Sequence, residues 1–201
     1  TDLGLSTSGA VAAFNGDGKH VALLQDRGII VVDVETGRTL SSATLPKVNV
    51  AEVFDNGSGP KVYHDLETPS RRMSQIAWNK SRNIILTVTE LWPYELDLGD
   101  DQIQIWDGSM LKILRTLHAS PLFAMMAPNG KWILIIPDNE KGKPEIWSVD
   151  TGEQIQEFDL KGYMTAAISP DSETIAFGKI NIDGTAETSL WRAGDAKRGG
   201  K

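Results

Sequence analysis

Histidines and carboxylates are the side chains of this 201-residue sequence best suited to chemistry, so their spacing is considered first. The segment Asn181–Glu187 places amide and acidic side chains around a glycine, as calcium loops do, but it lacks the regular ligand spacing and the terminal bidentate glutamate of such a loop. His20, His64 and His118 stand on separate segments with no short metal-binding spacing. We therefore expect a hairpin turn at Asn181–Glu187, and neither a metal nor a cofactor.

Patterns for catalysis are also missing from the sequence. Because the chain has no cysteine, thiol catalysis, thiolate ligation and disulfides are excluded. There is no Gly-x-Ser-x-Gly elbow and no glycine-rich phosphate loop. Asp100 and Asp101 are consecutive, so on an extended backbone their side chains diverge and cannot share a proton. We expect no catalytic residue and a protein that is not an enzyme.

Charge and hydropathy limit the partners of the protein. The chain has 20 Lys and Arg against 27 Asp and Glu, a net charge of −7, which disfavours general binding to nucleic acid. No apolar run approaches the roughly 18–20 residues that a membrane-spanning helix needs. With 40% hydrophobic and 23% charged residues, the composition is that of a single globular domain over residues 1–201. Since the chain starts at Thr1 without a leader pattern, we expect a cytoplasmic location.

The elements that must position any site follow one repeated pattern. Short runs of alternating apolar residues, separated by Asn-Gly, Asp-Gly and Pro-Asp turns, predict antiparallel strands joined by hairpins. Four such units cover about 10–45, 73–117, 121–160 and 163–195, with an insertion at 46–72. The last unit has no recognisable fourth strand. The sequence predicts an all-β chain of about four units, each of four antiparallel strands.

Several motifs in these units resemble WD40 repeats. The turn Phe14–Gly18, the triplet Ile105-Trp106-Asp107 and the segment Ile168–Asp171 match the family's first turn and the Trp-Asp that ends its third strand. This resemblance implies a β-propeller, or part of one, whose blades are the four units. The chain departs from the family in lacking the Gly-His pair and in keeping Trp-Asp only at Trp106-Asp107, so the family's Ser-His-Asp-Trp tetrad is not expected in any blade.

The number of blades leaves three alternatives, because four is the lower limit for propellers. The chain is a small closed ring in which Leu3–Thr7 supplies the outer strand of the last unit, a half-ring that pairs with a second copy, or a piece of a longer propeller. In each case we expect the apolar residues of the first and third strands to be buried between sheets: Phe14, Ile76, Trp78, Trp106, Phe123, Met125, Trp147, Ile168 and Trp191.

Two long interruptions predict the binding surface. In a WD40-like blade, the insertion 46–72 and the loop Glu90–Asp101 open onto the same rim as the loops Pro137–Pro144 and Asn181–Glu187, and such loops usually carry function. Aromatic residues anchor interfaces and carboxylates steer a basic partner. The candidate partner-binding residues are Trp92, Tyr94, Glu95, Asp97, Arg71 and Arg72. The alternative is that Trp92 folds back to close its own hairpin.

The sequence thus favours a non-enzymatic scaffold that binds a protein partner through one rim. A partner with a basic surface would suit the carboxylates of that rim. A second possibility is a translation-initiation-type factor associated with RNA or the ribosome, because Asn83–Leu117 is similar to the propellers of such proteins. A third is a propeller enzyme or cofactor binder that uses the central funnel. Self-association is expected if the chain is half of a ring.

Overall fold

The computed structural model describes residues 11–25, 28–45, 70–92, 102–119, 121–137, 142–160, 162–181 and 183–194. In these residues the chain forms fifteen strands, grouped in four antiparallel sheets, and no helix. In every sheet each strand pairs with its neighbour in the chain. The all-β class expected from the sequence is therefore confirmed.

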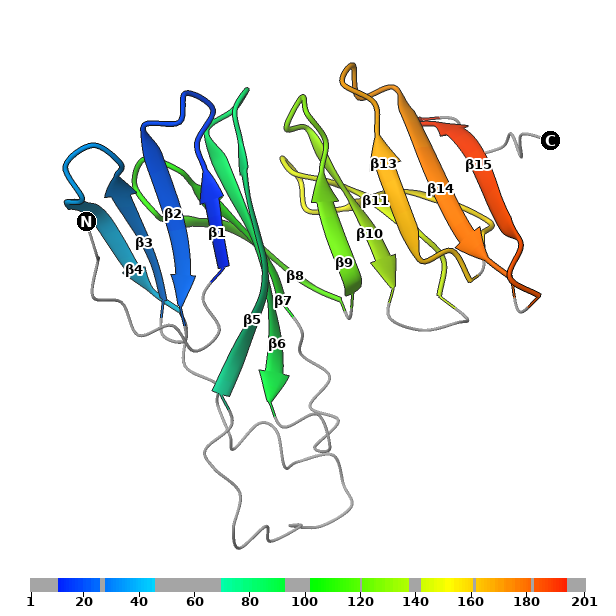
Figure 1. The fold of residues 1–201 in the computed structure, drawn as a ribbon, viewed down its shortest axis with the longest axis horizontal. Helices are drawn as coiled ribbons and strands as arrows, with labels where there is room; N and C mark the ends of the chain where they lie inside the picture. Colours follow the sequence, from blue (N-terminus) through cyan, green and yellow to red (C-terminus); the bar gives the residue numbers. More distant parts are fainter. Residues whose placement is uncertain are drawn as a thin grey trace, which may run out of the picture.

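The sheets follow one another in chain order and lie side by side in a row (Figure 1). The first contains β1 (Val11–Phe14), β2 (His20–Gln25), β3 (Gly28–Asp33) and β4 (Thr39–Thr44), and the second contains β5 (Ser70–Asn79), β6 (Ile84–Trp92), β7 (Gln102–Asp107) and β8 (Ile113–His118). The third contains β9 (Pro121–Met126), β10 (Trp132–Pro137), β11 (Glu145–Ser148) and β12 (Gln154–Glu157). The fourth contains β13 (Thr165–Ile168), β14 (Thr174–Ile180) and β15 (Ala186–Arg192).

Local hydrogen bonds explain why the third strands end where they do. The Asp33 carboxylate accepts hydrogen bonds from the backbone N–H and the hydroxyl of Thr36, both at 2.7 Å. At the equivalent position, Asp107 accepts from the backbone N–H groups of Ser109 and Met110, both at 2.8 Å. Aspartate side chains favour such turns because they replace a backbone acceptor. In the first two sheets, the aspartate that follows Val32 or Trp106 thus builds the turn into the fourth strand.

The core consists of three apolar layers, one between each pair of consecutive sheets. Leu24 and Ile29 of the first sheet pack with Ile85 and Trp106 of the second. A second layer joins the second and third sheets through residues such as Leu86, Ile105 and Ile133. In the third layer the ring of Phe158 lies 5.0 Å from that of Phe177 and 5.4 Å from that of Trp191. Burial of these faces stabilises the stack, because each removes apolar surface from water.

The turns also connect neighbouring sheets. The buried Asn79 amide donates to the backbone oxygens of Ala127 and Pro128, at 2.9 and 3.2 Å. The Arg82 guanidinium donates to the Asp150 carboxylate at 2.7 Å and holds the pKa of that exposed carboxyl below its usual range. These contacts therefore join the second sheet to the third at the edge where the β5–β6 turn lies.

The burial expected for the aromatic and apolar positions is found in full at two of them, in part at six, and not at Phe14. Trp106 and Trp191 are buried, and the remaining ones are partly buried against the layers: Ile76, Trp78, Phe123, Met125, Trp147 and Ile168. Phe14 is 61% exposed, so its predicted burial is wrong. The reason is its place in the row: it lies on the face of the first sheet that no other described sheet covers.

The described strands form an open row. The first and fourth sheets lie at opposite ends of it (Figure 1), and no described strand of the one pairs with a strand of the other. The fourth sheet has three described strands. Leu3–Thr7, expected to complete that sheet, lie outside the described residues.

Candidate functional site

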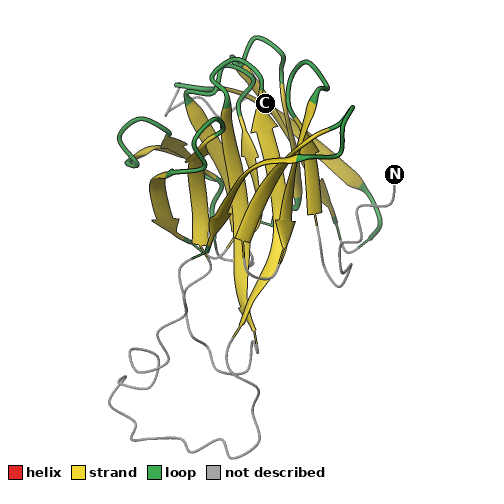
Figure 2. Cartoon of the chain, turned by 90° about the vertical axis from the view of Figure 1, so that its left-hand side faces the viewer, coloured by secondary structure: helices red, strands yellow, loops and turns green. Residues whose placement is uncertain are grey.

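The hairpin β5–β6 projects beyond the rest of the structure. Its strands are ten and nine residues long, the longest of the described strands. Their pairing runs from Asn79↔Ile84 to Ser70↔Trp92, with a register shift between Met73 and Gln75. The outer part of the hairpin passes the lower edge of the neighbouring sheets (Figures 1 and 2). A bulge of this kind increases the local twist of a strand, which turns the outer part of the hairpin away from the sheet.

This hairpin corrects the expected bounds of the two interruptions. Residues 70–72 belong to β5 and not to an insertion, and residues 90–92 belong to β6 and not to a loop. Pairing of the two segments with each other provides the backbone hydrogen bonds that the apolar pattern alone did not predict. In Figure 1, β6, β10 and β14 all end at the lower edge, and β5 begins there.

The register places three of the candidate residues around one stretch of this hairpin. Arg72 pairs with Glu90, Arg71 pairs with Leu91, and Trp92 pairs with Ser70. Residues directly opposite on antiparallel strands have their Cβ atoms about 4.5–5.5 Å apart, so the hairpin sets a basic position across from an acidic one. The side chains of Arg71, Arg72 and Trp92 lie outside the described part of the structure, as do the whole residues Tyr94, Glu95 and Asp97.

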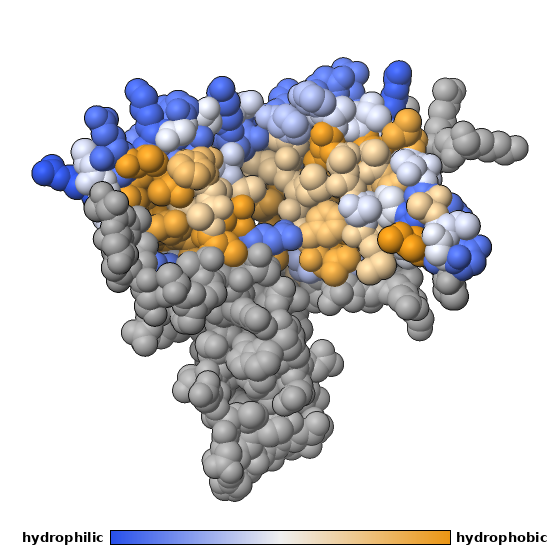
Figure 3. All heavy atoms as spheres, viewed as in Figure 1, coloured by the Kyte–Doolittle hydropathy of each residue, from blue (hydrophilic) through white to orange (hydrophobic). Residues whose placement is uncertain are grey.

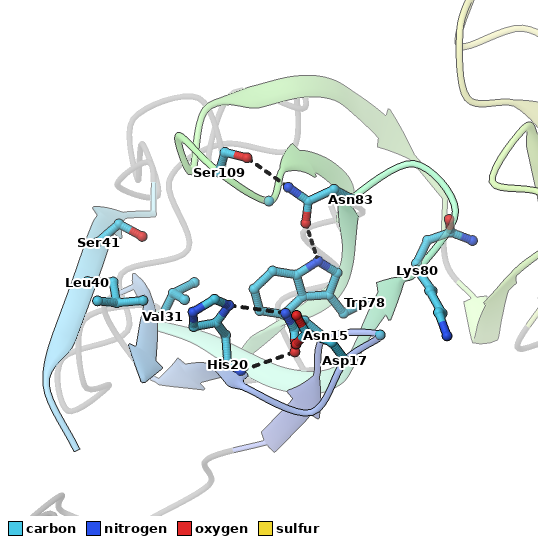
Figure 4. Close-up of a pocket in the computed structure, with 13 residues that line it drawn as sticks. Asn15, Asp17, His20, Val31, Leu40, Ser41, Trp78, Lys80, Asn83 and Ser109 are labelled. Atoms are coloured by element: carbon cyan, nitrogen blue, oxygen red, sulfur yellow. Dashed lines mark hydrogen bonds between the residues drawn. The ribbon is translucent and has the colours of Figure 1, made fainter. Parts of the chain in front are cut away.

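A cleft of about 540 Å³ lies at the opposite edge, between the turns of the first and second sheets (Figure 4). Sequence reasoning did not predict this cleft. Its walls come from residues between 15 and 41 of the first sheet and between 78 and 109 of the second, whose meeting depends on how the two sheets stack. The residues that line it include Asn15, His20, Leu40, Trp78, Asn83 and Ser109.

Residues on each wall of the cleft form hydrogen bonds with one another. The Asn15 amide nitrogen lies 3.1 Å from His20 Nδ1, and the His20 backbone N–H donates to the Asn15 side-chain oxygen at 3.1 Å. On the facing wall, Trp78 Nε1 donates to the Asn83 side-chain oxygen at 2.8 Å, and the Asn83 amide donates to the Ser109 hydroxyl at 2.7 Å (Figure 4). These polar groups stabilise turns, and the imidazole and indole rings supply a partly apolar wall.

A second hollow, of about 390 Å³, lies where the first strands of the first three sheets approach one another. It is lined mainly by apolar side chains of Val11, Ile76, Leu86 and their neighbours. Its polar side chain, Gln75, accepts a hydrogen bond from the backbone N–H of Ala124 at 2.9 Å. That bond ties the second sheet to the third and occupies the Gln75 oxygen.

The carboxylates with altered acidity also serve the fold. Hydrogen bonds from the Thr36 hydroxyl and backbone lower the pKa of Asp33, and those from Thr185 lower the pKa of Asp183. Both carboxylates are exposed and bond to residues two or three positions further along the chain. The hairpin turn expected at Asn181–Glu187 lies between β14 and β15 but is shorter, since residues 186 and 187 belong to β15; the Asn181 backbone N–H donates to the Thr185 carbonyl at 2.8 Å.

Among the described residues, no group of three or more histidines, cysteines or acidic residues is placed to hold a metal ion. The same residues contain no helix that is long and apolar enough to cross a membrane. No protein-family model matches the chain, and no curated protein matches it.

Proposed function

We propose that this protein is a non-enzymatic scaffold, a WD40-like β-propeller or a part of one, that binds a protein partner at the edge where β5–β6 projects. The observation that carries this proposal is the extended pairing of the hairpin, from Met73↔Thr89 to Ser70↔Trp92. A projecting hairpin presents its outer end to a partner. Ser70 and Trp92, the described residues at that end, pair with each other and belong one to each of the two interruptions.

The propeller type is supported by how the sheets repeat. Four sheets of consecutive antiparallel strands stack face to face, and two of the third-strand tryptophans, Trp106 and Trp191, are buried in the layers between them. The turn contacts repeat as well. Asn79 reaches from the second sheet to Ala127 of the third, and the Asn129 backbone N–H donates to the Ser172 hydroxyl of the fourth at 3.0 Å. Radial sheets that stack in this way make a rigid support for variable loops.

The candidate residues suit a partner with a basic surface. Trp92 and Tyr94 are the kind of side chain that gains most when an interface removes it from water. Glu95 and Asp97, in a chain of net charge −7, attract cations over a distance and so speed association. Elsewhere in the described structure, the side chains of the cleft and the turns form hydrogen bonds mainly with one another. Such bonds stabilise the fold, as expected of a scaffold.

The test begins with a photo-cross-linking amino acid introduced at position 94. The matched control carries the same group in place of Met110, which is 70% exposed in the β7–β8 turn at the opposite edge. The proteins captured only from position 94 are identified by mass spectrometry, and the captured partner is then purified.

Binding of the purified partner is measured with Trp92→Ala/Tyr94→Ala and with Met110→Ala. We expect the double variant to lose at least about tenfold in affinity and Met110→Ala to bind as the parent does. Added salt should slow association more than it speeds dissociation. Normal binding by a double variant whose circular dichroism is unchanged would refute the proposal, as would equal capture from both positions.

A further inference from the structure

The strand register defines, in the second, third and fourth sheets, a row of three residues that faces the preceding sheet. Each row joins the end of the first strand, the start of the second and the end of the third, and lies in the layer shared with the sheet before it. The rows are Trp78–Ile85–Trp106 in the second sheet, Met126–Ile133–Trp147 in the third and Ile168–Ile175–Trp191 in the fourth. The equivalent row of the first sheet is Phe14–Val21–Val32.

A second row in each sheet faces the sheet that follows. These rows are Ala13–Ala22–Val31 in the first sheet, Ala77–Leu86–Ile105 in the second and Met125–Leu134–Ile146 in the third. The equivalent row of the fourth sheet is Ala167–Ala176–Leu190. The first sheet thus has a face built to receive a preceding sheet, and the fourth has a face built to receive a following one.

Neither of these end faces is covered by a described sheet. On the first, Phe14 is 61% exposed, while Val21 is half-buried and Val32 is buried. Figure 3 shows apolar residues gathered over the first sheet, at the left end of the row, beneath a hydrophilic upper edge. On the fourth, Leu190 and Ile180 are 64% and 75% exposed, and their register puts them on one face. Large exposed apolar side chains on a flat sheet face mark a surface for association.

The two end faces match each other in side-chain size at their first two strands. Between the first and second sheets, the bulky Trp78 and the small Ala22 belong to one buried layer. The fourth sheet repeats the small side chains of the first at Ala167 and Ala176, and Phe14 stands where the second sheet has Trp78. A bulky row facing a small row is how the layer between the first and second sheets is already packed.

We propose that the end faces bind each other between two copies of this chain, with the fourth sheet of one copy stacked on the first sheet of the next. One copy cannot make this contact alone, since its two end faces lie at opposite ends of the row (Figure 1). The contact is head-to-tail, so two copies that use it twice close a ring, and copies that use it once extend the row. It involves other residues than the partner-binding edge proposed above.

Two variants and their mixture test this contact by sedimentation velocity. Phe14→Asp places a charge on the first-sheet face and Leu190→Asp on the fourth-sheet face, while Met110→Asp is the control at an exposed turn. We expect the parent and the control to sediment as assemblies of two or more copies, and each face variant as a monomer. An equimolar mixture of the face variants should form dimers, because each supplies the intact face that the other lacks, and growth should stop there.

Three results would overturn the proposal. They are a parent that stays monomeric at every concentration tested, an effect of one face variant without the other, and a mixture that fails to pair. Should either charged variant not fold, cysteine replaces the same residues, which is selective because the chain has none of its own. A bismaleimide should then join Phe14→Cys to Leu190→Cys, and Met110→Cys to neither. Absence of the mixed cross-link would equally refute the contact.

Discussion

Replacing Trp106 with alanine removes the largest side chain that is fully buried in the described core. Its indole is 1% exposed, between the first and second sheets. On its own sheet it pairs with Ile85 and Ile113. Its Nε1 donates a hydrogen bond to the hydroxyl of Thr87, at 3.0 Å, and Thr87 is itself fully buried.

Trp106→Ala should lower the free energy of unfolding by about 3–5 kcal/mol. The loss is this large because the variant gives up the burial of the ring and also leaves a cavity in the core. Domains are commonly stable by only about 5–15 kcal/mol, so the variant should be markedly less stable. Trp106→Phe keeps most of the apolar contact and leaves the Thr87 hydroxyl without its donor, which costs about 1–3 kcal/mol. The order parent, Trp106→Phe, Trp106→Ala should follow.

Urea unfolding followed by circular dichroism measures these free energies, at one protein concentration so that association does not change the comparison. Thr87→Val and the double variant Trp106→Phe/Thr87→Val complete a cycle, with a coupling energy of about 0.5–1.5 kcal/mol from the hydrogen bond. A loss below about 1 kcal/mol for Trp106→Ala would refute the buried position of the ring. A coupling near zero would refute the hydrogen bond alone.

Three further outcomes can be checked. Gly130→Ala should lower the free energy of unfolding in urea more than Gly18→Ala does. Both glycines have a positive φ, which costs about 1–2 kcal/mol for a residue with a side chain. Only at Gly130 would a Cβ also come within 2.8 Å of the Asn79 side-chain oxygen. Equal costs would exclude the close approach. Asn79→Ala should cost about 1–3 kcal/mol by the same assay, because it removes donors to backbone oxygens of the third sheet, and a neutral result would contradict that link. NMR titration should find the pKa of Asp33 below its ordinary 3.8 and higher in Thr36→Val, since the Thr36 hydroxyl is the main cause. With a lowered folded pKa, Asp33 contributes stability above the unfolded pKa and loses it as pH falls through the folded one.

The sequence by itself determined the strands and their turns. The third strand of the second sheet, Gln102–Asp107, carries the alternating residues typical of a strand, and the turns after Asp33 and Asp107 follow from aspartates that bond within the turn. Such features are local: period-two alternation and turn chemistry act over a few residues. They suffice to define four units of antiparallel strands.

Only the tertiary structure decided what each sheet face meets. Phe14 and Trp78 occupy equivalent register positions, yet Phe14 is mostly exposed and Trp78 is partly buried, because a described sheet precedes the second sheet and none precedes the first. The cleft around His20 and the extension of β5 back to Ser70 likewise depend on partners far along the chain. Whether a residue is buried depends on the sheet that packs against its face. A local pattern shows that a face is apolar but does not specify what covers it.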